Sequence, residues 1–435
     1  MKKTNYYKNL VNKINDKTLK VSVIGLGYVG LPLSLFIAKN NFTVHGIDID
    51  KKKILRTYKN EYLSNKINIK SKKSWEKNFK IFNNYDKISH SDLVIICVPT
   101  PLTSDKKPDL SYLKSVSMSL KGKLSKGTLV ALESTSYPGT TKEFFIDPLK
   151  KQLKVGEELF VGFSPERIDP NRNENKLDKI PKVVSGYTNK CKNLMNLFYK
   201  KIFKKIHVAP SLEVAELSKL LENIYRAVNI GFINEMKFVA EKMNIDIYET
   251  ILAAKTKPYG FRPFMPGPGI GGHCIPIDPY YLFWKAKKKG ANARFIKLAG
   301  IINEDTQKRI VEKVINYLKK EKINKAKILI IGLGYKKNID DMRESPSIPI
   351  IKALKKRNHI ISYSDQYIKK IPKIKNFDIK LKNVKISEQN LTKFDCTLIL
   401  ADHDYYDYKK ILKFSKIIFD TRFAYKKKYK KVVRI

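Results

Sequence analysis

Cysteine is scarce in this chain. The four cysteines lie far apart, and no two of them are separated by only two residues: Cys97, Cys191, Cys274 and Cys396. Structural zinc sites and disulfide frameworks use cysteines in close or regularly spaced sets. The sequence therefore favours neither a metal site nor disulfides, and we expect four reduced thiols.

Long apolar runs are lacking as well. No stretch approaches the roughly 18 consecutive apolar residues that indicate a membrane span. The first 20 residues are basic and polar, without the apolar centre of a secretory signal. A length of 435 residues with 43% hydrophobic residues is typical of a soluble, globular chain of about three domains, or of two domains and a long connecting element. We expect a cytoplasmic protein with no membrane partner.

Acidic residues are few: 41 Asp and Glu stand against 87 Lys and Arg, which gives a formal net charge of +46. The lysines are spread over every segment of the chain rather than gathered in one motif. Such a charge favours solubility and a general attraction of polyanions at low salt. No recognised nucleic-acid module accompanies it, so we expect no nucleic-acid partner.

A glycine turn near the N-terminus indicates a dinucleotide site. A β-branched apolar run at 20–24 predicts a strand, and residues 31–39 predict a helix. The turn between them consists of Gly25, Leu26, Gly27, Tyr28, Val29 and Gly30. In such a turn the first glycine allows the tight bend, the second lets the backbone approach a pyrophosphate, and the third allows close helix packing. The helix N-terminus then offers N–H groups to the phosphates.

An acidic residue at the end of the next predicted strand supports the same site. Asp48 follows the run 43–47 and lies 23 residues after Gly25, where a carboxylate can accept hydrogen bonds from ribose hydroxyls. It would repel a 2′-phosphate, which favours NAD over NADP. The lysines at 51–53, of which Lys53 is the candidate cofactor contact, leave NADP open.

Three further apolar runs, at 93–98, 128–132 and 159–163, end in polar turns. Ligands of open parallel sheets bind beyond the carboxyl ends of the strands, so these turns should border the cofactor and its substrate. Their candidate residues are Pro99, Thr100, Thr135, Glu166 and Arg167. Repeated strand, polar turn and helix predict a doubly wound α/β domain over residues 1–208.

Residues 209–242 predict one long helix, because apolar residues recur there at helical spacing. Glu216, Lys219 and Asn223 share a face distinct from the apolar stripe. A solvated charged face is the alternative reading of these three residues. A helix of about 30 residues spans roughly 45 Å, so it can join two domains and offer a dimer surface.

The stretch 266–281 combines four glycines and two prolines just before Cys274. Neither an ordinary helix nor a central strand tolerates this composition, so we expect a shaped loop. A thiol on such a loop, with Asp278 four residues later, has the parts for covalent catalysis. The alternative is a small buried hydrophobe, and His273 cannot be assumed to activate its neighbour.

After two predicted helices, at 281–289 and 293–320, the opening pattern returns. A strand at 327–331 leads into Gly332 and Gly334, but Lys337 stands where a third glycine would be. We therefore expect a second Rossmann-like sheet, with strands at 360–363, 396–400 and 417–420, that is not a second dinucleotide site. The basic residues of its turns, Lys336, Lys337 and Arg343, suit a phosphate-bearing substrate.

The predicted fold class is α/β, with two Rossmann-like doubly wound domains joined by a long central helix. The expected boundaries are 1–208 for an NAD-binding domain, 209–310 for a central helical domain that carries the cysteine loop, and 311–435 for a domain that binds the phosphate-bearing substrate, which the resemblance described next implies to be a UDP-sugar.

Together these motifs resemble the UDP-glucose/GDP-mannose dehydrogenase family, and within it most the branch that oxidises UDP-N-acetylglucosamine. The matching stretches cover nearly the whole chain: Val23–Leu33, Val98–Pro101, Ser164–Arg167, Glu216–Lys219 with Asn223, Gly271–Cys274 with Asp278, and Arg343–Ser345. The resemblance implies two successive oxidations at sugar C6, which reduce two NAD and give a uronic acid. One departure is Asn171, where the family usually has glycine; asparagine tolerates positive φ.

The resemblance also implies residue roles. Cys274 would be the nucleophile; Lys219, Asn223 and Asp278 would hold the reacting oxygens and a water; Glu166 would assist hydrolysis of a thioester. Substrate contacts are implied for Arg167, Phe264, Gly269, Gly271, Lys336 and Arg422, and for Arg262 in its own or a partner subunit. Thr135 and Arg343 would border NAD.

An aldehyde has no second hydride to give until a nucleophile adds to it, which Cys274 can supply. The leading hypothesis is therefore an NAD-dependent 6-dehydrogenase of a UDP-N-acetyl-hexosamine, foremost UDP-N-acetylglucosamine, that forms a homodimer or higher oligomer through the central helix. UDP-N-acetylmannosamine, UDP-N-acetylgalactosamine and UDP-glucose stay open as substrates, and the resemblance implies a use in surface polysaccharide synthesis. The alternative from another class is a non-catalytic polyanion-binding protein on a dehydrogenase scaffold.

Overall fold

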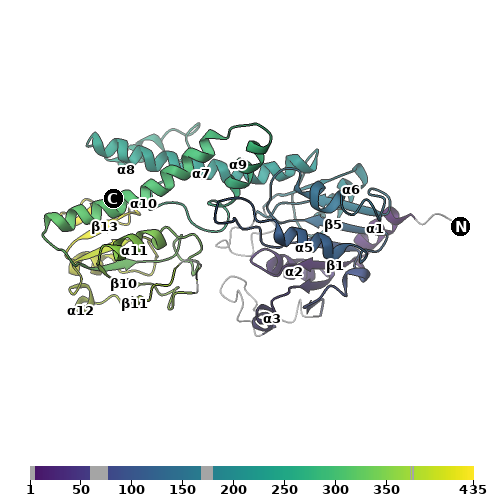
Figure 1. Ribbon diagram of the computed structural model, residues 1–435, viewed down its shortest axis with the longest axis horizontal. Coiled ribbons are helices and arrows are strands. Elements are labelled where there is room, and N and C mark those ends of the chain that lie inside the picture. The colour runs from purple at the N-terminus through teal and green to yellow at the C-terminus, as the bar shows by residue number, and fades with distance from the viewer. Residues whose placement is uncertain (1–4, 59–76, 168–179, 373, 375–376) are drawn as a thin grey trace. The chain divides into compact units, whose positions relative to one another are not determined.

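The computed structural model describes residues 5–58, 77–167, 180–372, 374 and 377–435 (Figure 1). The chain forms two compact units. The first consists of Met1–Glu222 with Tyr280–Lys289, and the second of Asn223–Pro279 with Gly290–Ile435. The central segment is thus shared between the units, and the three-domain division stays a prediction. Asn171 lies outside the described residues.

The first unit is built on an eight-stranded sheet of order β3-β2-β1-β4-β5-β6-β7-β8. Its strands are β1 (Lys20–Ile24), β2 (Thr43–Ile47), β3 (Phe79–Phe82), β4 (Leu93–Ile96), β5 (Thr128–Leu132), β6 (Leu159–Phe163), β7 (Lys182–Gly186) and β8 (Ile206–Val208). The first six run parallel in the order typical of dinucleotide-binding domains. β7 departs from this pattern, because it pairs antiparallel with β6.

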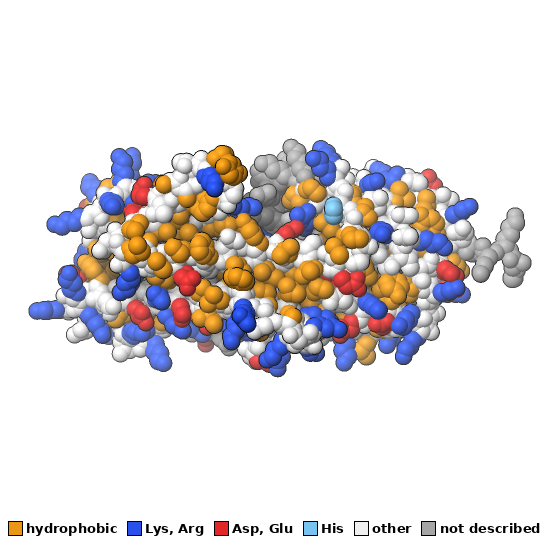
Figure 2. All heavy atoms as spheres, turned by 90° about the horizontal axis from the view of Figure 1, so that it is seen from above, with side chains coloured by type: hydrophobic (Ala, Val, Ile, Leu, Met, Phe, Trp, Pro, Cys, Tyr) orange, Lys and Arg blue, Asp and Glu red, His pale blue; other side chains and the backbone are white. Residues whose placement is uncertain are grey.

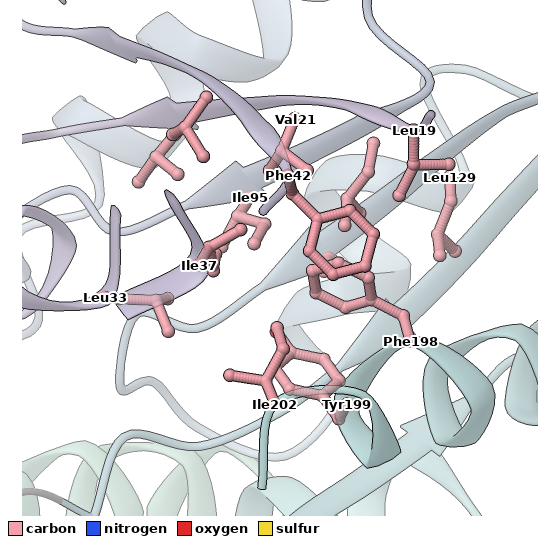
Figure 3. Close-up of a cluster of buried hydrophobic side chains, with 14 of the residues drawn as sticks. Leu19, Val21, Leu33, Ile37, Phe42, Ile95, Leu129, Phe198, Tyr199 and Ile202 are labelled. Atoms are coloured by element: carbon pink, nitrogen blue, oxygen red, sulfur yellow. The ribbon is translucent and has the colours of Figure 1, made fainter. Parts of the chain in front are cut away.

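Helices pack on this sheet because its buried strands are apolar on both faces. Val21, Ile95 and Leu129 belong to one core cluster, in which Ile37 of α2 and Phe198 of α6 also lie (Figure 3). The alternate strand residues build the core of the opposite face together with α5. The helices of this unit are α1 (Tyr6–Asn15), α2 (Gly30–Lys39), α3 (Lys51–Tyr58), α5 (Ser111–Leu120), α6 (Asn189–Lys200) and α9 (Asp278–Lys288), with short helical turns η2 (Ile88–His90) and η3 (Lys142–Ile146). The first two residues of α9 belong to the second unit.

The second unit repeats the topology in a parallel six-stranded sheet of order β11-β10-β9-β12-β13-β14. Its strands are β9 (Lys327–Ile331), β10 (Ile360–Ser364), β11 (Lys382–Asn383), β12 (Cys396–Ile399), β13 (Ile418–Asp420) and β14 (Val432–Arg434). Its helices are α8 (Ile247–Ala254), α10 (Arg294–Lys320), α11 (Ser347–Lys356), α12 (Glu388–Leu391) and α13 (Tyr408–Phe414). The expected second Rossmann-like sheet is confirmed.

The long helix is confirmed as α7 (Leu212–Lys242), which stands between the two sheets in the chain. Its burial differs from what the apolar spacing suggests. Glu216, Lys219 and Asn223 are buried, whereas Leu217 and Leu221 are exposed. The reading of the polar residues as a solvated charged face is therefore wrong.

Two negative observations complete the description. Among residues that the structure describes, no helix is both long and apolar enough to cross a membrane. In the same part of the chain, no group of three or more His, Cys, Asp or Glu residues could hold a metal ion.

Candidate active site

The glycine turn after β1 is shaped by backbone crowding. Gly25 has φ +92°, and a Cβ there would lie 2.8 Å from the carbonyl oxygen of Cys97; a Cβ at Gly30 would lie 1.9 Å from the carbonyl oxygen of Gly25. At Gly27 nothing lies within 4 Å of a Cβ position. The first and third glycines therefore close the turn, and the second leaves its surface open to a ligand. Tyr28 and Val29 complete the turn, and Tyr28 is exposed.

Asp48 is fastened to this turn. Its Oδ2 accepts the N–H of Leu26 at 2.8 Å, and its Oδ1 accepts the N–H of Asp50 at 3.0 Å. Each carboxylate oxygen has further lone pairs, so the group can also accept ribose hydroxyls. Glycine turn and acid together fit a dinucleotide. Lys53 lies in α3, and its side chain is outside the described part of the structure.

The strand ends next to the turn are tied together. β4 pairs with β1 on one side and β5 on the other, which brings Pro99, Thr100 and Thr135 to the carboxyl edge of the sheet. The hydroxyl of Ser134 donates to the carbonyl of Val98 at 2.8 Å. These residues thus lie where open α/β sheets bind their ligands.

Glu166 and Arg167 follow β6. Glu166 is buried. Arg167 forms an ion pair with Glu222 of α7, 2.7 Å between Nη2 and Oε1, and donates to the carbonyl of Pro181 at 2.7 Å. In the structure Arg167 therefore joins the turn after β6 to α7.

Glu216 attaches α7 to the turn after β5. Its carboxylate accepts the N–H groups of Gly139 at 2.5 Å and Thr141 at 2.8 Å, and the hydroxyl of Thr141 at 2.7 Å. Burial raises its pKa to about 7, although these hydrogen bonds act in the opposite direction. Lys219 lies one turn further along the same helix and is buried. Glu216 therefore fixes where α7 presents Lys219.

Asn223 and Asp278 form a buried pair in the second unit. The side-chain amide of Asn223 donates to the carboxylate of Asp278, and Arg226 donates to the amide oxygen of Asn223. Neither Asn223 nor Asp278 is more than 3% exposed. The amide and the carboxylate, predicted from separate motifs, are thus in direct contact.

Cys274 is the one cysteine of the four that is not buried. Its carbonyl accepts the N–H of Ile277 at 3.1 Å and of Asp278 at 2.8 Å. This turn ends the glycine-rich loop and begins α9, so that the thiol and the carboxylate are one helical turn apart in the chain. The reading of Cys274 as a sealed core residue is excluded.

The loop before Cys274 is fastened at three points. The N–H of Gly267 donates to Asn234 of α7 at 2.9 Å, that of Ile270 to Asn303 of α10 at 2.5 Å, and that of Gly272 to the carbonyl of Arg343 at 3.0 Å. These bonds connect the cysteine loop to both long helices and to the segment between β9 and α11. The asparagines lie far away in the chain, so local sequence patterns do not reveal them.

The glycines of the loop are needed for close packing. At Gly271 a Cβ would lie 2.5 Å from the Cβ of Tyr335 and 2.8 Å from the carbonyl oxygen of Glu344. Gly269 has φ +126°, and its Cβ would meet Asn303 at 2.8 Å. A side chain at Gly271 would push the loop away from the segment that follows β9, and one at Gly269 would push it away from α10.

Arg422 lies at the end of β13 and touches the same loop. Its Nε donates to the carbonyl of Leu400 at 2.8 Å and its Nη2 to that of Tyr335 at 3.1 Å. Its Nη1 is 3.2 Å from where a Cβ of Gly267 would be. A partly buried guanidinium held in this way offers a fixed positive charge beside the loop.

Comparisons with known proteins agree with this architecture. Three models of the UDP-glucose/GDP-mannose dehydrogenase family match consecutive parts of the chain: the NAD binding domain over residues 19–204, the central domain over 213–305 and the UDP binding domain over 329–427. The chain belongs to the UDP-glucose/GDP-mannose dehydrogenase family. It is an NAD-dependent UDP-sugar dehydrogenase, and its cofactor is NAD.

Relatives within this family differ in substrate. The chain is 36% identical to a UDP-N-acetyl-D-glucosamine 6-dehydrogenase of Pseudomonas aeruginosa, over 81% of this chain and 84% of the relative. It is 31% identical to a UDP-N-acetyl-D-mannosamine dehydrogenase of Methanococcus vannielii, over 94% of this chain and 93% of that relative. A solved UDP-N-acetylmannosamine dehydrogenase of Pyrococcus horikoshii superposes with a TM-score of 0.86 at 29% identity, over 95% and 98%.

The second sheet of this UDP-sugar dehydrogenase carries an altered copy of the dinucleotide turn. Asp365 accepts the N–H of Leu333 at 2.9 Å, as Asp48 accepts that of Leu26. Its carboxylate is also 3.2 Å from Nε2 of His403, and Nδ1 of His403 accepts the N–H of Asn338 at 2.7 Å. The protein's own side chains thus occupy the region around the acid where a dinucleotide ribose would bind.

The remaining predicted substrate and cofactor residues lie around the same turn or before the cysteine loop. Lys336 is exposed next to Tyr335, whereas Lys337 pairs with Asp404 at 2.6 Å. Arg343 forms a bidentate pair with Asp341, with its Nη2 2.6 Å from Oδ2. The family's dehydrogenase role for each of these residues stays a prediction, as it does for Phe264 and the exposed Arg262.

Proposed function

We propose that this dehydrogenase oxidises the C6 hydroxyl of a UDP-N-acetyl-hexosamine, foremost UDP-N-acetylglucosamine, to the uronic acid in two steps. The observation that carries this proposal is the position of Cys274, which is only partly buried and lies in a loop that ends at the buried Asp278–Asn223 pair. A nucleophile beside a carboxylate is what the second oxidation requires and a simple alcohol dehydrogenase does not.

The first step removes a hydride from C6 and a proton from its hydroxyl. NAD, held by the glycine turn and Asp48, supplies the hydride acceptor. Lys219 and Asn223 hold the reacting oxygen, and the ammonium of Lys219 stabilises negative charge that develops there. The proton leaves through the carboxylate of Asp278 or through water. The product of this step is the aldehyde.

The second step begins when Sγ of Cys274 bonds to the aldehyde carbon and the oxygen takes a proton. This adduct gives up a hydride to a second NAD and a proton to solvent, which leaves a thioester. Water then adds to the thioester carbon, the C–S bond breaks, and the carboxylic acid leaves the regenerated thiol. Glu166 and Asp278 take the proton of the attacking water. One sugar and one water thereby reduce two NAD.

UDP-N-acetylglucosamine is supported by the 36% identity to the enzyme of Pseudomonas aeruginosa. UDP-N-acetylmannosamine is the second candidate, favoured by the 94% coverage of the archaeal relative and the TM-score of 0.86. The two sugars differ only in configuration at C2. UDP-N-acetylgalactosamine and UDP-glucose are weaker alternatives.

A panel of four UDP-sugars with purified enzyme and NAD tests the substrate assignment. We expect kcat/KM for UDP-N-acetylglucosamine to exceed that for the C2 epimer by at least about tenfold, because misplacing one polar group in a pocket costs about 1–3 kcal/mol. Cys274→Ser enzyme serves as the blank. A preference for UDP-N-acetylmannosamine would move the enzyme to the second candidate, and turnover of UDP-glucose alone would contradict the N-acetyl-hexosamine assignment.

We also propose that the enzyme is a homodimer through α7. One face of this helix exposes apolar side chains along its whole length: Val214, Leu217, Leu221, Tyr225, Phe232, Val239 and Met243. Leu221 is 62% and Phe232 53% exposed. Figure 2 shows apolar side chains gathered on the face that carries α7 and α10. A continuous apolar stripe on a long helix is typical of a face that another copy covers.

Sedimentation velocity of the Leu221→Glu variant tests the dimer. We expect the dissociation constant to rise at least about tenfold, because a central apolar contact contributes more than about 1 kcal/mol to such interfaces. Met118→Glu, which alters an equally exposed residue of α5, should leave the dimer intact. A monomeric wild-type enzyme would overturn the proposal. We also propose that Arg262, whose side chain is exposed, contacts the substrate of its own or of the partner subunit.

We place the enzyme in the cytoplasm. Its proposed chemistry needs Cys274 as a thiol, and none of the four cysteines, all of which the structure describes, forms a disulfide. Free thiols persist in reducing compartments.

A further inference from the structure

A buried cluster in the first unit has no part in the scheme above. Lys182 begins β7, and its Nζ lies 2.6 Å from Oε2 of Glu133, which follows β5. Both side chains are at most 4% exposed. The hydroxyl of Tyr199 in α6 donates to the other oxygen of Glu133. The same Nζ lies over the rings of Tyr199 and Phe203, at 5.3 and 5.6 Å.

Such a pair is expensive to bury. Removing two charges from water costs several kcal/mol for each ion, and apolar residues of the same volume often give equal or greater stability. Burial raises the pKa of Glu133 despite the attraction of Lys182, and the charge of Glu166 acts in the same direction as burial. Stability alone therefore does not explain the cluster.

The third contact of Lys182 suggests what it does. Its Nζ also donates to the carbonyl of Pro165 at 3.2 Å. The carbonyl of Pro165 and the nitrogen of Glu166 belong to the same peptide group. The hydrogen bond therefore fixes the orientation of this peptide plane, which is directly joined to the Cα of Glu166. β7 reaches this position because it runs antiparallel to β6.

We propose that Lys182, held by Glu133 and Tyr199, is a positioning residue that orients Glu166 for hydrolysis of the Cys274 thioester. Lys182 connects Glu133, at the start of the turn after β5, to the peptide group before Glu166, in the turn after β6. The turns after these two adjacent strands are thereby held together. The inference rests on the proposed function, in which Glu166 handles a proton of the attacking water. It predicts a defect in hydrolysis and not in hydride transfer.

The double variant Glu133→Gln/Lys182→Met tests this, because it removes both charges together and leaves neither buried alone. We expect kcat to fall about 100-fold, as misplacement of a reacting group by about 1 Å does. The thioester should accumulate, so that intact-mass spectrometry during turnover detects an acyl adduct on Cys274. The rate of the first NADH formed in a single turnover and KM for the UDP-sugar should stay near their wild-type values.

Two further variants sharpen the result. Lys182→Arg keeps a donor for Oε2 of Glu133 and for the carbonyl oxygen of Pro165. Its kcat should therefore be higher than that of the double variant, and the acyl adduct should not accumulate. Lys126→Met, which breaks the exposed ion pair with Glu158, is the matched control and should form no adduct. A double variant that melts like wild type, turns over like wild type and shows no adduct overturns the proposal.

If the double variant does not fold, Tyr199→Phe decides, because it removes one hydrogen bond to Glu133 and little volume. A measurable adduct supports the proposal, and wild-type kcat without an adduct refutes it. Glu166→Gln separates this inference from the proposed function. If Glu166→Gln accumulates no acyl adduct, the proposed hydrolytic role of Glu166 is wrong. If Glu166→Gln accumulates the adduct but the Lys182 variants do not, only the positioning role of Lys182 is wrong.

Discussion

At the scale of single residues, the contact between Asn223 and Asp278 links two motifs that are 55 positions apart. The amide of Asn223 donates a hydrogen bond to the buried carboxylate of Asp278 and thereby also fixes its orientation. Asn223 and Asp278 thus explain each other's burial: a buried carboxyl group needs hydrogen-bond partners, and the amide supplies one without adding charge.

Asp278→Asn should lower kcat about 100-fold or more, since positioned acid–base groups contribute about 10²–10⁴-fold. KM for the UDP-sugar should change little, because the loop and Arg422 are retained. Steady-state kinetics of NADH formation measures both. Asp246→Asn is the matched control: Asp246 caps α8 and pairs with Arg434 outside the site. Equal losses in the two variants would contradict the role of Asp278.

Several single residues were predictable and others were not. Gly25 and Asp48 lie in a local pattern whose spacing indicates a dinucleotide site, whereas the roles of Cys274 and Asp278 rest on the family resemblance and stay predictions. Glu133 and Lys182 lie in no such pattern, because their partners come from distant strands and a lysine at the start of a strand suggests exposure. The only local signal for this cluster was Glu133, a charged residue directly after a buried strand.

At the scale of elements, the strands were the easiest to predict. β1, β2, β5, β6 and β9 have the bounds expected from their apolar runs, because a strand buried on both faces is continuously apolar. α1, β3, β7 and β14 were not expected. β7 begins with the buried Lys182, and β14 has only three residues, so neither gives a clear apolar signal.

The helix α7 shows why spacing alone misplaces a face. Its leucines recur with helical period, yet Leu217 and Leu221 are exposed and Glu216 is buried. The polar face is buried because it meets backbone N–H groups of the turn after β5. Sequence periodicity records which residues share a face, but not what that face contacts.

The attachment of α7 should depend on pH. Glu216 has a pKa of about 7 in the folded protein and near 4.5 when unfolded. Between these values the folded state keeps a proton that the unfolded state releases, so stability is lost as pH rises through about 7. A tenfold change in proton affinity corresponds to about 1.4 kcal/mol, which makes the loss about 3 kcal/mol.

Urea midpoints measured from about pH 5 to pH 8 test this. Glu216→Gln cannot ionise, so its midpoint should fall less over that window than the wild-type midpoint. Glu235→Gln, at an exposed position further along α7, should retain the wild-type slope. Parallel curves for all three proteins would show that Glu216 does not titrate in this range.

At the scale of the whole molecule, one sheet topology is used for two purposes. The first six strands of the first sheet and the six strands of the second have the same order, and in both sheets an acid after the second strand accepts an N–H of the glycine turn. In the first, the turn is open at Gly27. In the second, His403 and Asn338 occupy the corresponding region, and Arg422 and the cysteine loop offer a different surface. The sequence indicated this divergence only through Lys337.

The charge of +46 acts on the molecule as a whole and not on the site. Its lysines are distributed over both units, and several near the site, such as Lys337, are paired. The charge therefore predicts solubility and salt-dependent attraction of polyanions, whereas substrate recognition depends on a few fixed groups.

The claim that the thiol of Cys274 makes this a four-electron oxidation is tested most directly by the ratio of NADH formed to UDP-sugar consumed, measured together with the acid by mass spectrometry. The wild-type enzyme should give two NADH and one uronic acid for each sugar. Cys274→Ser should form no net acid, while Cys191→Ser, which alters a buried cysteine of α6, should keep the ratio of two. One NADH per sugar with released aldehyde, or undiminished acid from Cys274→Ser, would contradict the account.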